Sequence, residues 1–221
     1  MNELKEFIIQ NARPLPVILL LDVSGSMSGE KIFSLNNAVK EMLRVFANET
    51  STQAELNVCI ITFDDVAKLH TPLQPASKIH WADFNAIGMT ALGAALDMAR
   101  NIIENKETIP SRAYRPVVVL VSDGEPNDKG WEEKLNRFVN EGRTSKCDRF
   151  AMGIGSADEQ VLKSFINDEN KKVFHAQDAG TINKFFKFIT MSTLQRSRSA
   201  SPNEIIKYLP DNLSEFDFFA D

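Results

Sequence analysis

The sequence of 221 residues is poor in cysteine and histidine, with 2 and 3 copies respectively. Cys59 and Cys147 stand in or beside separate apolar runs and form no CxxC motif, so neither a zinc knuckle nor a redox pair is indicated. We expect both thiols to be buried as small hydrophobic groups. His70, His80 and His175 lack the HxH or HxxxH spacing of a zinc site. Zinc and thiol chemistry are therefore not predicted.

Long apolar runs are also missing. The longest, Val17–Leu21, is far shorter than the ~20 residues that cross a bilayer as a helix. Residues 1–10 carry Glu3, Lys5 and Glu6 and lack the basic start and cleavage site of a signal peptide. We therefore expect a cytoplasmic protein.

An excess of positive charge is missing as well. The chain has 30 acidic and 25 basic residues, a net charge of −5, which disfavours unspecific binding to nucleic acid or anionic lipid. With 43% hydrophobic residues, a chain of this length can bury a core without disulfides or a structural metal. The composition indicates a globular protein and excludes a disordered tail protein and a collagen.

Apolar runs and apolar residues at helical spacing alternate along the chain, which predicts alternating strands and helices. Strands are predicted at Val17–Asp22, Leu56–Phe63, Val66–His70, Pro116–Ser122, Phe150–Ile154 and Lys172–His175. Helices are predicted at Glu30–Phe46, Ala91–Glu104, Lys129–Glu141, Asp158–Phe165 and Ala179–Met191. This order predicts an α/β fold: a doubly wound, mostly parallel sheet with helices on both faces. The hairpin at Asp64-Asp65 adds one antiparallel strand.

The C-terminal part differs in composition from the rest. Arg196–Pro202 is polar and rich in turn residues, which favours a linker. Residues 209–221 mix leucine and phenylalanine with Asp211, Glu215, Asp217 and Asp221. Such a segment either docks on a partner or packs back on its own domain, and both interpretations stay open. We divide the chain into an extension (1–13), a domain (14–192), and a linker with an acidic-aromatic tail (193–221).

Oxygen-bearing side chains gather where the predicted strands end. Three stand at alternate positions after the first strand, one precedes a helix in GMTALG, and one ends the strand PVVVLVS. They are Asp22, Ser24, Ser26, Thr90 and Asp123. The carboxyl ends of parallel strands meet at one edge of the sheet. Hydroxyls and carboxylates without histidine or cysteine suit a magnesium-like ion.

This set resembles the metal-ion-dependent adhesion site of von Willebrand factor type A domains, over residues 14–192. The resemblance implies a six-stranded, Rossmann-like sheet with one antiparallel edge strand. It also implies that Ser24, Ser26 and Thr90 bind the ion through hydroxyls, and that Asp22 and Asp123 bind it directly or through water. The ion would be Mg²⁺, or else Mn²⁺ or Ca²⁺. A Glu or Asp of a partner protein would complete the coordination, in a module that is not an enzyme.

Three segments carry a narrower resemblance. LPVILLLDVSGSMSGEKI, TFDD and GMTALGAAL are similar to the bacterial tellurium-resistance Y-type (TerY-like) proteins. This resemblance implies kinase and phosphatase partners in stress and metal-resistance signalling.

Other interpretations of the same residues remain. Taken singly, Ser26 or Ser28 could cap the helix that begins near Glu30, and Asp123-Gly124 could form a common turn. A phosphohydrolase could use Asp22 and Asp123 on Mg²⁺ or Mn²⁺, although we expect no lysine or arginine beside them.

Two hypotheses concern partners. Met27, Met89, Glu125 and Asn127 would shape the surface that selects a partner. The tail could self-associate by placing Asp217 or Asp221 in the metal site of a neighbouring copy, under control of phosphorylation at Ser197, Ser199 and Ser201.

Overall fold

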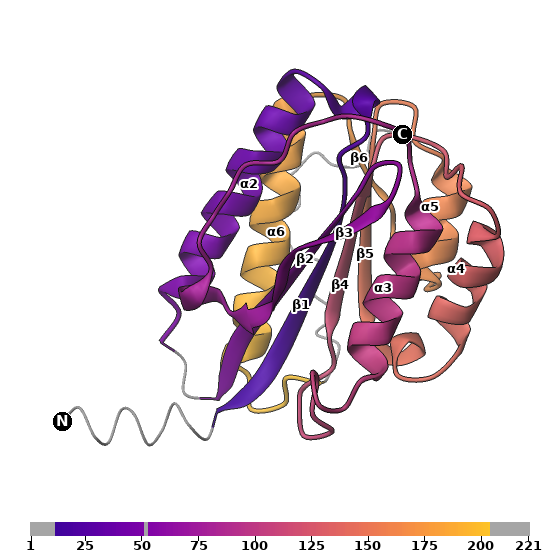
Figure 1. The fold of residues 1–221 in the computed structure, drawn as a ribbon. Helices are drawn as coiled ribbons and strands as arrows, with labels where there is room; N and C mark the ends of the chain where they lie inside the picture. Colours follow the sequence, from indigo (N-terminus) through magenta and orange to yellow (C-terminus); the bar gives the residue numbers. More distant parts are fainter. Residues whose placement is uncertain (1–11, 51–52, 204–221) are drawn as a thin grey trace.

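A computed structural model describes residues 12–50 and 53–203 (Figure 1). Its sheet has the strand order β3-β2-β1-β4-β5-β6, and all neighbours are parallel except β2 and β3. The strands are β1 (Arg13–Asp22), β2 (Ala54–Phe63), β3 (Ala67–Pro75), β4 (Val117–Ser122), β5 (Asp148–Ile154) and β6 (Phe174–Ala176). The predicted fold class, with its antiparallel edge strand, is confirmed.

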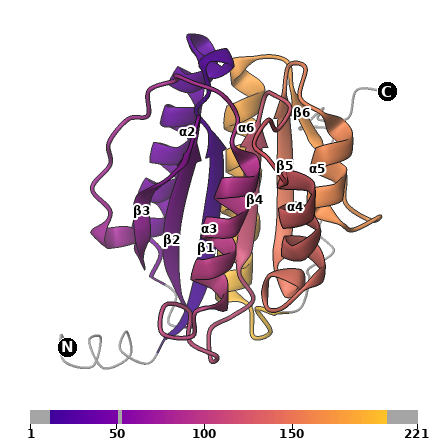
Figure 2. The same ribbon diagram turned by 45° about the vertical axis from the view of Figure 1, so that its right-hand side comes forward.

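Helices cover both faces of this sheet, as Figures 1 and 2 show. They are α2 (Glu30–Ala47), α3 (Leu92–Glu104), α4 (Trp131–Asn140), α5 (Glu159–Ile166) and α6 (Ala179–Arg198). One face packs against α2 and α6, the other against α3, α4 and α5. Across the described ranges, no helix combines the length and apolar character needed to span a bilayer.

The sheet separates two hydrophobic cores, one on each face, and the side chains of β1 contribute to both. Leu19 and Leu21 pack toward α2 and α6, and Ile18 and Leu20 pack toward the opposite helices, because successive side chains of a strand point to opposite faces. A strand buried on both faces is expected to be apolar at every position, as VILLL is. The predicted burial of both cysteines is confirmed, and both are free thiols.

Four strands, β1, β2, β3 and β5, are longer than predicted, and the two largest extensions, in β1 and β3, contain prolines. β1 pairs with β2 from Arg13 onward but with β4 only from Val17, so Pro14 and Pro16 lie where one side of the strand has no ladder to β4. β3 continues through Pro72 to Pro75, and it is an edge strand. Proline is tolerated at strand starts and sheet edges because it lacks only the N–H donor.

The helix α6 corrects the predicted linker. It continues to Arg198, so residues 193–198 are helical, and the linker prediction is wrong there. The Arg196 side chain is buried and donates hydrogen bonds to Asp148 Oδ2 (3.3 Å) and to the carbonyls of Arg115 and Pro202 (both 2.9 Å). A charged side chain is buried in this way only when it is paired.

Ser197 is fully buried, and its hydroxyl donates to the Leu194 carbonyl at 2.8 Å. Its role as an accessible phosphorylation site is therefore excluded, while Ser199 and Ser201 stay predictions. The acidic-aromatic tail (209–221) lies outside the described residues.

Candidate metal centre

The five predicted oxygen donors lie at the carboxyl edge of the sheet, around the neighbouring strands β1 and β4. Asp22 ends β1, Ser24 is the N-cap of a short 3₁₀ turn, η1 (Gly25–Met27), and Ser26 lies within that turn. Asp123 follows β4 directly. Ser26 is exposed, and the other four residues are buried. The structure therefore places the donors where the strand-end rule predicts them.

Hydrogen bonds join three of these side chains. The hydroxyls of Ser24 and Ser26 lie 2.9 Å apart, and Ser26 Oγ donates to Asp123 Oδ1 at 2.6 Å. Neither Ser26 nor Ser28 caps the following helix, because Gly29 is the N-cap of α2 and no side chain caps it. The capping alternative is wrong, and the Ser26 hydroxyl faces a carboxylate.

Asp22 is held rigidly behind the two serines. Its Oδ1 accepts the Ser24 N–H at 2.9 Å, and its Oδ2 accepts the Ser122 hydroxyl at 2.6 Å. Burial raises the pKa of the Asp22 carboxyl, and the hydrogen bonds from Ser122 and Ser24 oppose that rise. Both oxygens are already occupied by donors, so Asp22 suits an outer position that acts through water.

Thr90 reaches the site on the irregular segment 79–91. The Gly25 N–H donates to the Gly88 carbonyl (2.9 Å), and the Asn127 N–H donates to the Thr90 carbonyl (3.1 Å). These bonds tie the segment to the loops after β1 and β4. A Cβ on Gly124 would lie 3.3 Å from Thr90 Oγ1, so the glycine lets the loop that carries Asp123 lie against this hydroxyl.

Three further residues hold the Thr90 segment, and the sequence analysis did not identify them. Asp128 accepts the N–H groups of Gly93 and Ala94, both at 2.9 Å, and so caps α3. Asp65 accepts the Met89 N–H at 2.9 Å. The Asn36 amide, on α2, donates to the Phe84 carbonyl (3.1 Å) and accepts its N–H (2.8 Å). Asp128 could be recognised as an N-cap residue type, but only the fold brings it to α3.

Lys31 also belongs to the site, contrary to the expectation of no lysine beside the aspartates. Its Nζ lies 2.6 Å from Asp123 Oδ2 and donates to the Ser26 carbonyl at 3.1 Å. Asp123 thus accepts Ser26 on one oxygen and Lys31 on the other. The sequence did offer one indication that Lys31 could reach the site: it stands in the first turn of the helix that directly follows the loop with Ser24 and Ser26.

The surface around the site differs from the prediction at one residue. Met27 is fully buried in the core, because the turn η1 directs it inward. Met89 is 59% exposed and its neighbour Ile87 is 61% exposed. Glu125 and Asn127 are also exposed. Two apolar and two polar side chains therefore flank the donor set.

The chemistry of the donors fits a hard divalent ion. Two carboxylates and three hydroxyls offer oxygen alone, the ligand type that Mg²⁺, Ca²⁺ and Mn²⁺ prefer. Among the residues that the structure describes, no group of three His, Cys, Asp or Glu side chains is placed to hold a metal. The hydroxyls of Ser24, Ser26 and Thr90 are therefore essential to such a site.

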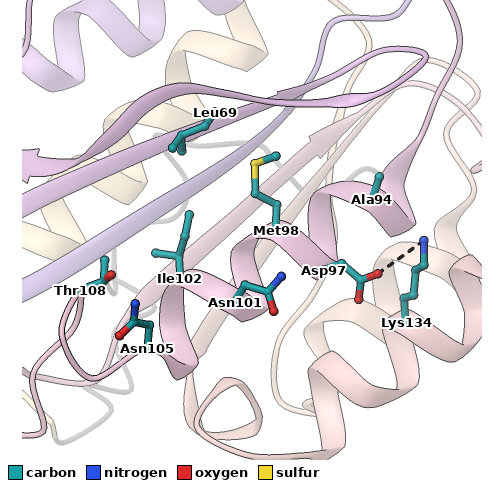
Figure 3. Close-up of a pocket in the computed structure, with 9 residues that line it drawn as sticks. All are labelled: Leu69, Ala94, Asp97, Met98, Asn101, Ile102, Asn105, Thr108 and Lys134. Atoms are coloured by element: carbon teal, nitrogen blue, oxygen red, sulfur yellow. Dashed lines mark ion pairs between the residues drawn. The ribbon is translucent and has the colours of Figure 1, made fainter.

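A separate hollow lies elsewhere, between β3 and α3 (Figure 3). It measures about 600 Å³ and includes Leu69, Met98 and Ile102, with an ion pair between Asp97 and Lys134 (3.5 Å) at one end. None of the five predicted donors lines it. This groove is distinct from the candidate metal centre.

Comparison with protein families identifies the fold. The model of the von Willebrand factor type A domain matches residues 17–188, which include all five donors. The chain belongs to the von Willebrand factor type A family. This family commonly mediates metal-dependent interactions between proteins.

Two curated relatives of this von Willebrand A-type chain are distant and longer. Matrilin-3 of Gallus gallus is 25% identical over 185 residues, covering 78% of this chain and 38% of the relative. Inter-alpha-trypsin inhibitor heavy chain H2 of Sus scrofa is 25% identical over 218 residues, covering 93% and 23%. The chain thus spans well under half the length of either relative.

Solved structures agree on the fold. The von Willebrand factor type A protein from Catenulispora acidiphila superposes with a TM-score of 0.62 at 19% identity, over 85% of this chain and 43% of that one. Proximal thread matrix protein 1 from the mussel byssus, with a zinc-occupied MIDAS motif, gives a TM-score of 0.62 at 16% identity, over 83% and 48%. A divalent ion is thus present at that motif in a protein of this fold.

Proposed function

We propose that this chain is a metal-dependent protein-binding module that recognises an acidic side chain of a partner. The observation that carries the proposal is the hydrogen-bonded series Ser24–Ser26–Asp123, with Thr90 beside the same loop. Ser24, Ser26 and Thr90 would hold Mg²⁺, or else Mn²⁺ or Ca²⁺, with Asp123 beside them and Asp22 behind. When bound, the ion supplies a Lewis-acidic position for a partner's carboxylate.

The residues of the site contribute differently to this role. Neutral hydroxyls leave the charge of a divalent ion less compensated than carboxylates would, which favours an additional anionic ligand. Asp22, fixed by Ser24 and Ser122, keeps the serine loop in place. The net charge of −5 would repel an acidic partner, so a local cation is required to reverse that repulsion.

The surroundings indicate the character of the partner's contact segment. Ile87 and Met89 expose apolar side chains next to Thr90, and Glu125 and Asn127 lie exposed beyond Asp123. A partner whose Glu or Asp is flanked by apolar residues would fit this surface. Interfaces of this kind combine an apolar contact with one fixed polar anchor.

The proposal extends to the biological setting. The resemblance of LPVILLLDVSGSMSGEKI, TFDD and GMTALGAAL to tellurium-resistance Y-type proteins supports a role in stress or tellurium-resistance signalling, with kinase and phosphatase partners. A cytoplasmic location is part of the same proposal. The two free thiols support it, because unpaired cysteines are usual in reducing compartments.

The phosphohydrolase alternative is less well supported. The side chains that hydrogen-bond to Asp22 and Asp123 are the hydroxyls of Ser24, Ser26 and Ser122 and the ammonium of Lys31. Lys31 already pairs with Asp123, and within the described residues the carboxylate that each serine hydroxyl contacts is one of these same two aspartates. We therefore do not adopt hydrolysis.

A calorimetric titration with Mg²⁺ and with Mn²⁺ tests the metal site. Ser26→Ala and Thr90→Ala are expected to weaken binding by about tenfold or more, because each removes an oxygen ligand. Ser28→Ala is the matched control, since Ser28 is an exposed serine of the same loop outside the donor set. Equal affinities for the Ser26→Ala and Ser28→Ala proteins would contradict the assignment.

A displayed library of random peptides tests the partner chemistry. In Mg²⁺, the enriched peptides are expected to contain Glu or Asp beside apolar residues. Binding should be lost on Glu→Gln or Asp→Asn replacement in the peptide, in EDTA, and with the Thr90→Ala protein. Enrichment of peptides without an acidic residue would contradict the proposed recognition.

A further inference from the structure

Lys31 is the cationic side chain found on the carboxylate of the proposed metal site. Its ammonium contacts Asp123 Oδ2 at 2.6 Å and the Ser26 carbonyl at 3.1 Å. The Asp123 side chain is fully buried, whereas the Lys31 side chain is 38% exposed. The lysine thus reaches from solvent to a buried carboxylate.

The position of Lys31 is set by several elements. The residue belongs to the first turn of α2, directly after the loop that carries Ser24 and Ser26. Its Nζ also lies 3.8 Å from where a Cβ on Gly155, in the loop after β5, would stand. The ammonium therefore lies between the loops that follow β1, β4 and β5.

An ammonium and a divalent ion seek the same oxygens. Asp123 has two carboxylate oxygens, one accepting Ser26 and the other accepting Lys31. A divalent ion bound by Asp123 would stand within a few ångströms of this ammonium, and like charges at that distance repel strongly near a protein surface. When the ion binds, the lysine must therefore move away from Asp123. If it stays, it weakens the binding of the ion.

Withdrawal is open to Lys31 because of its exposure and chemistry. A lysine carries a compact charge on a flexible four-carbon stem, so its ammonium can move into water while the stem stays against the protein. Arg196, at the opposite edge of the sheet, is buried and hydrogen-bonded to two carbonyls and a carboxylate. Its guanidinium therefore cannot move into water in the same way.

We propose that Lys31 is a tethered cation that competes with the divalent ion for Asp123 and thereby sets the metal affinity of the site. The inference rests on the proposed function, since it concerns the same ion. Lys31 keeps the buried carboxylate neutralised, and the ion binds by displacing it. The measured affinity is then the difference between the two interactions.

Neutral replacements of Lys31 test the competition. Lys31→Met keeps much of the aliphatic stem and removes the charge, and Lys31→Gln keeps a hydrogen-bond donor without charge. Both are expected to bind Mn²⁺ about tenfold more tightly than the unchanged protein, a difference of about 1.4 kcal/mol. Calorimetry, and electron paramagnetic resonance of free Mn²⁺, measure the dissociation constants.

Lys40→Met is the matched control. Lys40 is an exposed lysine on the same helix, so its replacement changes the net charge equally without touching the site. Its Mn²⁺ affinity is expected to stay within about twofold of the unchanged protein, because an exposed charge on another turn of the helix is largely screened.

A second readout does not depend on titration heats. Without metal, Lys31→Met is expected to melt at a lower temperature, because the buried Asp123 carboxylate loses its partner. Saturating Mn²⁺ should then raise the melting temperature more in this variant than in the unchanged protein, since ligand stabilisation grows with affinity. Circular dichroism establishes that each variant is folded.

Different failures have different meanings. If the unchanged protein binds Mn²⁺ and loses it with Thr90→Ala, but the Lys31 and Lys40 variants have equal affinities, the competition is overturned and the proposed function stands. Weaker binding in Lys31→Met would likewise overturn it, showing that the lysine organises the site. No binding to the unchanged protein would overturn both proposals.

Discussion

Asp123 and Asp148 are buried aspartates at opposite ends of the neighbouring strands β4 and β5. Asp123 follows β4 at the carboxyl edge, and Asp148 begins β5 at the amino edge. Each carboxylate forms an ion pair with a lysine: Asp123 with Lys31, and Asp148 with Lys171. They differ in the other charges around them.

At the amino edge, one carboxylate has two cations. Lys171 and Arg196 both pair with Asp148, and the Arg196 side chain is only 6% exposed. At the carboxyl edge, Lys31 pairs with Asp123, and the buried carboxylate of Asp22 belongs to the same site. The Lys31 side chain is 38% exposed. The first arrangement fixes α6 to the sheet. The second leaves negative charge available to an added cation.

The same substitution at both positions should give the largest contrast. Asp148→Asn leaves two cations without a counter-charge and is expected to lower the free energy of unfolding by about 3–5 kcal/mol. Asp123→Asn breaks a pair with a partly exposed lysine, so about 1 kcal/mol or less is expected in EDTA. Urea unfolding followed by circular dichroism measures both. Equal losses would contradict the distinction between the two edges.

Two C-terminal truncations test how much the pairing of Arg196, on α6, with Asp148 contributes to stability. Deleting residues 196–221 removes Arg196 and should cost roughly 3 kcal/mol, because Asp148 loses a buried partner. Deleting residues 204–221 keeps Arg196, Pro202 and Asn203, and with them the bond from the Arg115 N–H to the Asn203 side chain (2.7 Å).

The unfolding midpoint of the shorter truncation is expected to be higher than that of the longer one, since these contacts remain. Matching midpoints for the two truncations would contradict the role of Arg196. The shorter truncation is also the suitable one for testing self-association by sedimentation, because the longer one disturbs the domain itself.

The reaction rates of the two thiols show which edge of the sheet is loosened by each substitution. This is the smallest of the expected effects. Burial raises the pKa of Cys59 and of Cys147 to about 12, so both should react slowly with a thiol reagent at pH 8 in the folded protein. Asp148→Asn should speed the reaction of Cys147, its neighbour, a few-fold while Cys59 stays protected. Asp123→Asn should leave both rates unchanged. Mass spectrometry of the labelled peptides separates the two sites.

The pH dependence of stability follows from the same thiols. Their ordinary pKa is near 9.0, so above that pH the unfolded chain releases protons that the folded chain retains up to about pH 12. Stability should therefore fall as the pH rises from 9 toward 12.

The position of the five candidate ligands at one edge of the sheet could be predicted, because most of them stand at or just after a strand end. Asp22 and Asp123 end apolar strands, Ser24 and Ser26 follow at alternate positions, and Thr90 precedes a helix. Parallel topology then brings strand ends together. Thr90 is the exception, because hydrogen bonds from distant residues such as Asn36 and Asn127 hold its segment in place.

Lys31, Asp128 and Arg196 could not be predicted in this way. Lys31 reaches Asp123 only because α2 starts in one particular direction. Asp128 caps a helix that begins more than 30 residues earlier in the chain, and Arg196 pairs with Asp148 across a separation of 48 residues. Local composition made the arginine look like part of a linker, whereas its burial depends on a partner that periodicity does not reveal.

The clamp between Asn36 and Phe84 has a consequence for how such a domain can diversify. One amide fastens segment 79–91 to α2, and backbone bonds fasten it again at Ile87 and Gly88. The stretch around these hydrogen bonds belongs to no strand or helix, and its residues Asn85, Ile87 and Met89 are exposed, whereas Ala86 packs against the core. Under the proposed function, a library that varies Asn85, Ile87 and Met89 is expected to change which partners bind while Thr90 stays unchanged. Under the proposed function, one short segment would then carry both an ion ligand, Thr90, and exposed side chains that can vary around it.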